Sequence, residues 1–495
     1  MMKRFTMLAV AALLVVGTAI GARAATEVKM TGDAMIYGSF WSHRNFTGWD
    51  PTETAREEKF QIWERFRLRT DFVASEAVKF RLGLRVQDTW GHGTFTAANP
   101  SNRSVQVYQA YLQFKWPNSD VEISAGLQDF SLPQTPIFCD SVVFGGTRAA
   151  AFVINTPIIP ETFSVVTGFS RMVQNSNDFT TNGAGAVGET YAQNLDLYFM
   201  TLPVTMDGFK ATPWAALAVA GRDVGYGNVG TYGMYNTLGE NLASAGSYVA
   251  ANNGRHLWNN AQNPYYWFGG AFELTVLDPV KFYADVIYGA GAMADRKSSK
   301  RSGWFVDLAA EYTGWDIVTP QIFGWWSTGE DKSTGNGSER MPTVVPNWGP
   351  GNNFLFDSSQ EFTLDGNMGV NPVGAWGLGA SLNNMSFVEK LTHRLSFIYM
   401  RGTNSPTAIR NINNLLGTSY NTNGYFLMGR DLTWNESLVS INLDSSYQIY
   451  ENLTAMIETG WAHGDFQKSV WGHSLYNRAN NGDVWKVTFG LTYKF

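Results

Sequence analysis

The sequence predicts an all-β fold, a transmembrane antiparallel β-barrel of about 18 strands. Three observations predict it. The chain ends in a long amphipathic strand, it begins with a signal sequence that no membrane-spanning helix follows, and short turns alternate along it with long polar loops. Together they indicate a chain that is exported and then crosses a membrane with strands.

The last thirteen residues form the clearest strand of the sequence. Apolar side chains occupy every second position up to the terminal residue, and polar or small side chains occupy the positions between them. This period of two is typical of a strand between an apolar and a polar medium. The stretch resembles the closing strand of bacterial outer-membrane barrels, and the resemblance implies an assembly signal that the barrel assembly machinery reads. Its residues here are Phe489, Leu491, Tyr493 and Phe495.

The first residues have the features of a secretory signal peptide. Lys3 and Arg4 precede an apolar run from Met7 to Ile20, and Ala22-Arg23-Ala24 fits a cleavage site. We therefore expect a signal peptide at 1–24 and one barrel domain at 25–495. After this segment no window approaches the roughly 20 apolar residues that a membrane-spanning helix needs.

The composition also favours a barrel over a large soluble domain. Only 16% of the 495 residues are charged, whereas typical soluble domains have about 25%. The formal net charge is −6 and becomes −9 without the three basic residues of the signal peptide, so nothing suggests nucleic-acid binding. Cys139 is the only cysteine, and the six histidines show no metal-ligand spacing. We expect no disulfide, no metal and no cofactor.

Three strands alternate clearly after the signal peptide, from about Val28 to Phe40, Phe60 to Val73 and Val78 to Gln87. From there the chain repeats a strand, a tight turn, a second strand and a long Gly/Asn/Ser-rich connection. Short periplasmic turns and long extracellular loops are typical of outer-membrane barrels. The long connections lie near 42–59, 89–104, 130–147, 172–192, 222–264, 328–374, 403–435 and 464–482.

Counting strands in this way gives about 18, an even number that returns both chain ends to the periplasmic side. Two segments, 148–156 and 375–385, are short and rich in Ala and Gly, so 16 is the competing count. A barrel of 16 to 18 strands is too wide for side chains to fill and leaves an aqueous channel. A soluble two-sheet sandwich would also alternate, but it would not place Trp and Tyr repeatedly at strand ends, as two membrane interfaces require.

Six basic residues gather on the second and third strands, on the face opposite the apolar residues. On a lipid face each Arg would cost about 2–4 kcal/mol at the bilayer midplane. We therefore expect them to line the lumen as a basic ladder, with Asp71 opposite Lys79 or Arg81. A single basic residue is often only a solvated wall position, but a cluster raises the local concentration of anions. The ladder consists of Arg65, Arg67, Arg69, Lys79, Arg81 and Arg85.

The third long connection follows the fifth strand and contains Phe144-Gly145-Gly146-Thr147. With the signal peptide, the strand pattern and the terminal Phe495, it resembles the general diffusion porins over essentially the whole chain, most of all the homotrimeric porins of sulfate-reducing bacteria. The resemblance implies that this loop folds into the lumen and forms the constriction. The acidic residues that usually flank the Phe-Gly-Gly tip are absent, so we expect a net basic constriction. The residues assigned to the constriction loop are Asp129, Asp140, Phe144, Gly145, Gly146 and Thr147.

These features predict a homotrimeric outer-membrane porin for passive diffusion of small hydrophilic solutes and ions, with a preference for anions. The alternative is a substrate-selective channel of 18 strands, in which the ladder guides carboxylates or inward-facing aromatic rings guide sugars. The long loops also leave open an adhesin or surface-structural barrel, or contacts with lipopolysaccharide and outer-membrane lipid. We expect no enzyme, since His393 falls on an apolar face and His463 lies near Asp465 in a polar loop. The inward-facing rings are Trp214, Trp267, Tyr283, Phe305, Phe323 and Trp325.

Overall fold

The computed structural model describes residues 26–43, 46, 59–91, 104–174, 191–222, 224, 237–247, 260–350, 371–416, 425–479 and 482–495. The predicted signal peptide at 1–24 lies outside these residues. Within them, no helix has the length and apolar character needed to cross a membrane.

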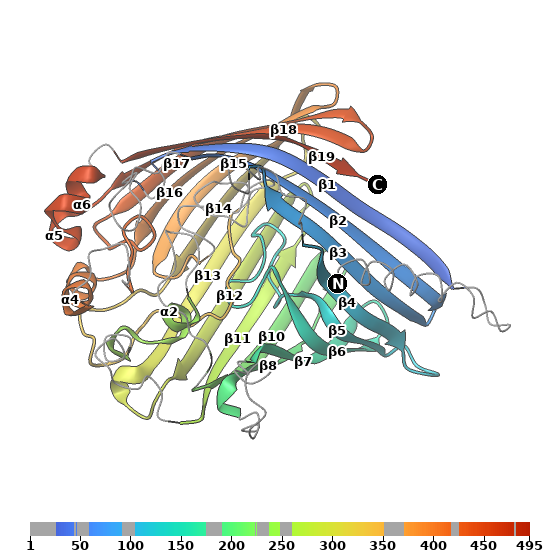
Figure 1. Ribbon diagram of the computed structural model, residues 1–495, viewed down its shortest axis with the longest axis horizontal. Helices are drawn as coiled ribbons and strands as arrows, with labels where there is room; N and C mark the ends of the chain where they lie inside the picture. Colours follow the sequence, from blue (N-terminus) through green and yellow to red (C-terminus); the bar gives the residue numbers. More distant parts are fainter. Residues whose placement is uncertain are drawn as a thin grey trace.

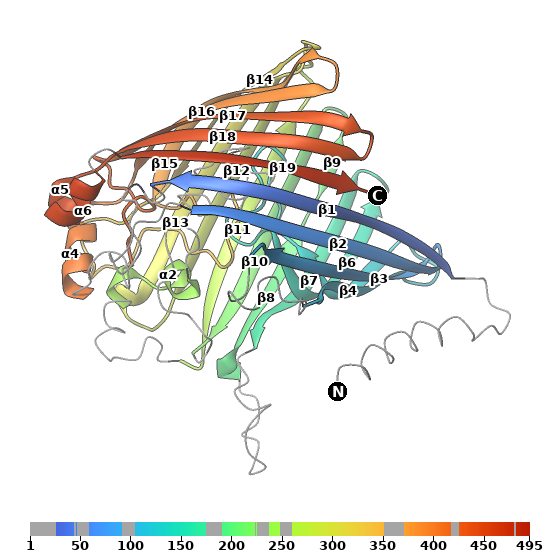
Figure 2. The same cartoon turned by 45° about the horizontal axis from the view of Figure 1, so that its top comes forward.

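The described strands form one closed antiparallel barrel (Figure 1). Each strand pairs with the next along the chain, and β19 (Asp483–Lys494) returns to pair with β1 (Glu27–Ser42), from Lys494 opposite Asp33 to Trp485 opposite Ser42. Figure 2 shows these two strands side by side. Because the sheet closes on itself, it leaves no unpaired strand edge.

The barrel has 18 strand positions, although 19 strand segments are present. β8 (Asn194–Thr201) and β9 (Val204–Met206) both pair with β7 and β10, so they share one position. Pro203 lies between them and has no backbone N–H to donate, which interrupts the ladder there. The other strands are β2 (Lys59–Ser75), β3 (Val78–Thr89), β4 (Gln106–Lys115), β5 (Glu122–Phe130), β6 (Thr147–Ile159), β7 (Phe163–Gln174), β10 (Phe209–Gly221), β11 (Gln262–Leu274), β12 (Val280–Ala292), β13 (Lys300–Tyr312), β14 (Thr319–Ser327), β15 (Ala375–Val388), β16 (Leu391–Gly402), β17 (Ser437–Tyr450) and β18 (Leu453–Asp465).

The predicted strand count of 18 is confirmed. The two weak segments, 148–156 and 375–385, lie within β6 and β15, and both strands are paired on either side. The competing count of 16 is therefore wrong. Ala and Gly weakened the sequence signal because they supply little apolar contrast, but a barrel wall imposes extended pairing on them from both neighbours.

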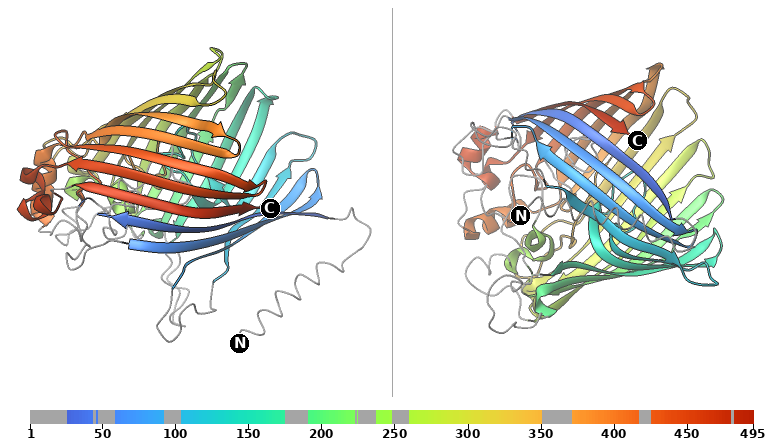
Figure 3. Two further views of the ribbon diagram at one scale, coloured as in Figure 1. Left: turned by 90° about the horizontal axis from the view of Figure 1, so that it is seen from above. Right: turned by 45° about the vertical axis from the view of Figure 1, so that its right-hand side comes forward.

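Short turns and long connections lie at opposite ends of the barrel, as predicted. Glu389-Lys390 and Asp207-Gly208 join strands directly, with positive φ angles of 64° at Lys390 and 71° at Gly208. The described α-helices all lie in the long connections and gather at one end of the barrel (Figure 2). The views in Figure 3 show the same end of the barrel from two further sides. The connection between β12 and β13, residues 293–299, is short and was not among the predicted long connections. The helices are η1 (Tyr191–Gln193), α2 (Leu238–Leu242), η2 (Lys297–Ser299), α4 (Pro406–Leu416), α5 (Lys468–Trp471) and α6 (His473–Arg478).

The outer face of the barrel is apolar. Along β19, the side chains of Trp485, Phe489 and Phe495 are all about half exposed on that face. The ring of Phe495 stacks on Phe66 of β2 at 6.1 Å, and it covers Gly32 of β1, where a Cβ would lie 2.4 Å from the ring. Glycine at this position lets the terminal aromatic ring lie flat across the closure of the barrel.

The inner face is polar on one side and apolar on the other. The large buried cluster unites the inward side chains of β10 to β14 with residues of the third loop (residues 131–146) and of the inner segment (residues 343–349). Both stretches therefore lie inside the ring of strands, which agrees with the prediction that the third loop folds into the lumen.

Candidate functional site

The basic ladder lies on the inward face of β2 and β3. The outward neighbours Phe66 and Phe80 are 42% and 39% exposed, and the basic side chains alternate with them. Strand register places Arg67 opposite Arg85 and Asp71 opposite Arg81. The pairing thus selects Arg81 from the two partners that the sequence allowed for Asp71.

Two carboxylates partly neutralise the ladder. Asp33 of β1 accepts from Arg67 Nε at 2.8 Å and from Arg65 Nη2 at 3.4 Å. Asp71 forms a bidentate pair with Arg81 at 2.6 and 2.7 Å. The six cations of the ladder and these two carboxylates give this wall a net charge of +4. In the described part of the chain, Arg69, Lys79 and Arg85 form no ion pair. The role of Asp33 was missed, although its place on the inward face of the first strand was readable from the alternation.

The third loop is fixed to the opposite wall by two aspartates. Thr135 donates its backbone N–H to Asp285 of β12 at 3.1 Å, and Gln134 donates to Asp307 of β13 at 2.8 Å. Asp285 and Asp307 are direct cross-strand neighbours, and both are buried. The loop therefore crosses the lumen from β5 and β6 to β12 and β13.

The return limb of the third loop is bonded to the inner segment along its backbone. Cys139 N–H donates to Gly349 O at 3.0 Å, Asp140 N–H to Asn347 O at 3.0 Å, and Gly145 N–H to Val345 O at 2.9 Å. The two stretches form one unit inside the barrel. Sequence reasoning did not find this partner, because a polar loop of the 328–374 connection carries no periodic signal.

Of the residues assigned to the constriction loop, Asp140, Phe144, Gly145 and Gly146 lie in this unit, whereas Asp129 and Thr147 lie in the flanking strands β5 and β6. Phe144 is fully buried at the base of the loop, 4.8 Å from the ring of Phe130. Gly146 has a φ of +60°, and a Cβ there would collide with the Asn347 side chain, so both the backbone and the space favour glycine. Gly145 packs against Asp140 and Ser141, and the Asp140 carboxylate accepts a hydrogen bond from Asn347 at 3.0 Å. Asp129 forms an ion pair with Arg148 at 3.1 Å. Thr147 is the first residue of β6 and lies opposite Phe130.

Trp348 is the centre of the packed side of the lumen. Its ring lies 5.3 Å from Phe138, 5.5 Å from Phe305 and 5.1 Å from Trp325, and its Nε1–H donates to Asp307 at 2.8 Å. The six inward-facing rings predicted as a possible sugar path are all buried in this region. That use of the rings is therefore wrong for Trp214, Trp267, Tyr283, Phe305, Phe323 and Trp325, because loop residues cover them.

A polar cavity of about 480 Å³ remains between the tip of the third loop and the wall from β13 to β18. Cys139 is exposed at the loop tip and lines it. On the wall, Arg394, Asp444 and Glu458 are successive cross-strand neighbours on β16, β17 and β18. This part of the open lumen therefore carries mixed charge, in contrast to the ladder.

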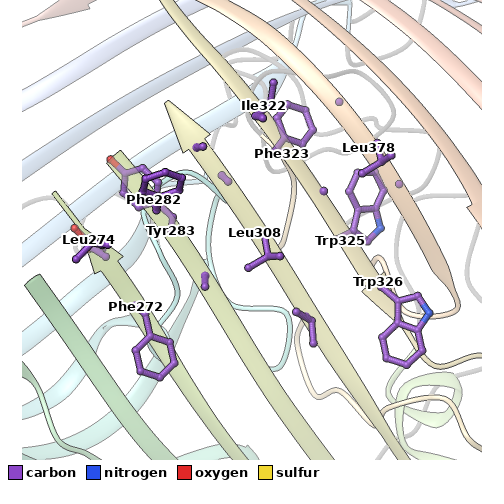
Figure 4. A pocket seen from close by; sticks show the side chains of 18 of the residues that line it. Phe272, Leu274, Phe282, Tyr283, Leu308, Ile322, Phe323, Trp325, Trp326 and Leu378 are labelled. Carbon is purple, nitrogen blue, oxygen red and sulfur yellow. The ribbon is translucent and has the colours of Figure 1, made fainter. Parts of the chain in front are cut away.

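A second hollow, of about 870 Å³, lies on the outer face of β11 to β15 (Figure 4). Phe272, Leu308 and Ile322 line it, and the small residues Ala284, Ala310 and Gly324 leave the space between them. Because this face is apolar and turned away from the lumen, the hollow is not on a solute path.

Buried ion pairs join the long connections above the packed side; we name this group the loop cap. Arg340 pairs with Asp431 at 2.8 Å, and Arg430 pairs with Asp431 at 2.8 Å and with Glu240 at 3.3 Å. Burial would raise the pKa of Asp431, but Arg430 and Arg340 hold it below its ordinary value. Burial raises the pKa of Glu330 in the same cap to about 7, against the hydrogen bond from Ser338 and the attraction of Arg340.

The histidines considered for catalysis do not form a catalytic set among the described residues. His393 Nδ1 lies 2.7 Å from Ser445 Oγ, and the described residues supply no acid or amide bonded to its other ring nitrogen. His463 bonds to Asp483 at 2.8 Å rather than to Asp465. Neither arrangement orders a nucleophile, a base and an orienting group as hydrolysis requires.

The closed pairing and the apolar outer face define a transmembrane β-barrel, the architecture of bacterial outer-membrane proteins. No protein-family model and no curated protein matches the sequence. The chain is similar to the solved structure of the outer membrane protein OprD from Pseudomonas aeruginosa, with 12% identity, a TM-score of 0.49 and coverage of 96% of this chain and 95% of that one. OccK8 (OprE) from the same organism gives 8% identity, a TM-score of 0.49 and coverage of 95% and 98%. At this level the likeness carries no function over to this chain.

Proposed function

We propose that the protein is a passive diffusion channel of the bacterial outer membrane for small hydrophilic solutes, with a wall charge that favours anions. The observation that carries the proposal is the open, polar side of an 18-strand lumen next to an inward-folded loop. A lumen of this size holds water unless loops fill it, and the loop residues that the structure describes inside the ring of strands pack against the side of β10 to β14.

The anion preference follows from the ladder. The chain as a whole is negative, but salt screens charges that lie more than about 8–10 Å from a passing ion. Charges on a low-dielectric wall act on a passing ion more strongly than charges in open water. The net +4 of the ladder should therefore outweigh the overall charge.

The remaining parts of the proposal rest on resemblance and on the outer face. The resemblance to homotrimeric porins, including those of sulfate-reducing bacteria, supports a trimer with one channel per subunit after removal of residues 1–24. The apolar face would contact outer-membrane lipid, and the long loops would contact lipopolysaccharide. The aromatic face ending in Phe495 would be the signal for the barrel assembly machinery.

A substrate-selective channel is the second candidate, and the cavity beside Arg394 supports it. Its mixed charges and hydroxyl groups could hold a solute during passage, whereas a purely diffusive channel needs no such site. Transport that saturates with solute concentration would favour this candidate, and a linear dependence would favour simple diffusion.

Recording in a planar bilayer under a KCl gradient tests the channel and its charge preference together. Replacing Arg65, Arg67 and Arg69 by Ser should shift the zero-current potential toward cations, more strongly at low salt. The matched control replaces Arg296, Lys297 and Lys300 by Ser, which removes the same charge from exposed positions in and beside the β12–β13 connection. An equal shift in both triple variants would show that the ladder does not border the ion path.

A further inference from the structure

A cavity of about 350 Å³ lies on the inner wall where β19 meets β1, and we name it the seam cavity. Three of its lining residues were not assigned to any site from the sequence. They are Thr492 and Lys494 of β19 and Asp33 of β1. Three arginines of β2 complete its polar lining. The lining residues with polar side chains are Thr31, Asp33, Arg65, Arg67, Arg69, Thr492 and Lys494.

Three polar atoms of these residues are buried and lack hydrogen-bond partners. They are Thr492 Oγ1, Arg65 Nε and Arg69 Nε, and Thr492 is only 5% exposed. Burying a donor without a hydrogen-bond partner is unfavourable, because the donor loses its bonds to water. The two arginine Nε atoms can only donate a hydrogen bond, and the Thr492 hydroxyl can also donate one. The lining therefore offers three donors to a ligand that accepts hydrogen bonds.

The charge of the cavity defines the kind of acceptor. Arg65, Arg67, Arg69 and Lys494 bring four positive charges, while Asp33 brings one negative charge, which leaves +3. Both oxygens of Asp33 are already engaged by Arg65 and Arg67. A ligand with two negative charges and several acceptor oxygens would balance most of this charge and accept hydrogen bonds from the unpaired donors.

We propose that the seam cavity binds a small, doubly charged oxyanion, with sulfate as the simplest probe. The proposal deepens the proposed anion preference, on which it rests, by adding a discrete site at the barrel closure. Arg65 Nε, Arg69 Nε and the Thr492 hydroxyl donate to the oxyanion, and Lys494 supplies charge.

Calorimetric titration of the purified barrel in detergent tests the site without relying on conduction. At constant ionic strength, sulfate should bind saturably, and acetate or chloride should bind at least about tenfold more weakly because each carries one charge. Thr492→Val and Arg69→Gln should each weaken sulfate binding roughly tenfold, since each removes one hydrogen bond to a charged ligand. The control is Thr459→Val on β18, whose hydroxyl donates to Leu443 O on the outer face.

The outcomes separate this site from the channel itself. Absence of saturable sulfate binding, or equal weakening by Thr492→Val and Thr459→Val, would overturn the proposal. If Thr492→Val fails to fold, as judged by heat-dependent mobility in SDS gels, Arg69→Gln and Lys494→Gln decide the question. A barrel that conducts ions but binds no sulfate refutes only the site, and one that binds sulfate but conducts nothing refutes only the channel.

Discussion

The two sides of the barrel interior have opposite chemistry, although the same strand alternation builds both. On β10 to β14 the inward residues include many aromatic, alanine and glycine residues, and Trp267 and Phe305 are fully buried there. The two inward aspartates of this wall, Asp285 and Asp307, bond to the third loop. On β2 and β3 the inward residues include the charged residues of the ladder, and the side chains of Arg67 and Arg81 keep about a quarter of their surface exposed. The described residues of the third loop and of the inner segment pack on the wall that offers apolar contact. The inward residues therefore decide which wall of the lumen these loop residues cover.

Removing the centre of the packed side should have the largest effect on stability. Trp348→Ala deletes a fully buried ring and the donor to Asp307, and such a loss costs about 3–5 kcal/mol. Urea unfolding in detergent would measure it. The control is Trp326→Ala, because that ring is 45% exposed on the outer face. Equal losses in the two variants would mean that the lumen side is not packed as described.

The loop cap above the packed side should weaken as the pH rises. Glu330 is buried, accepts from Ser338, and joins two long connections, since its backbone N–H donates to Asn404 Oδ1 and its carbonyl accepts from Ser405 N–H. Its pKa is raised to about 7, so the folded cap favours the protonated form. Arg340 and Arg301 favour ionisation of the carboxyl group, whereas burial and Glu339 oppose it.

The stabilising contribution of protonated Glu330 is complete below its ordinary pKa of 4.5 and is lost as the pH rises through 7. The loss should reach about 3 kcal/mol by the linkage of pKa to stability. Cleavage by a protease in the cap should be faster at pH 9 than at pH 5. Glu330→Gln controls for the pH dependence of the protease, and a wild-type rate change no larger than that of the variant would contradict the prediction.

The sequence was sufficient for the barrel wall but not for what fills it. The alternation on β19, β1 and β2 follows from contact with lipid on one face and water on the other, so it is visible in each strand's own sequence. The strand count and the inward direction of the ladder could therefore be predicted from it. The contact of Trp348 with Phe138 joins two loops that are more than two hundred residues apart in the sequence. The periodicity of apolar residues within a short stretch of sequence does not predict a contact between two distant loops. The ion pairs of Asp33 are an intermediate case. The sequence predicts that Asp33 faces inward, but its partners follow only from the register between β1 and β2.

Cys139 offers the smallest and most local test of the open side. It is the only cysteine, it is exposed at the tip of the third loop, and it lines the polar cavity opposite Arg394. A negatively charged thiol reagent should reduce single-channel conductance partly, because it adds bulk and charge to a passage that stays open elsewhere. A positively charged reagent of the same size should reduce the conductance to anions less. If the channel is a trimer, the reduction should come in three equal steps. Cys139→Ser should not respond to either reagent, and a wild-type channel that reacts without any change in current would place the loop tip outside the ion path.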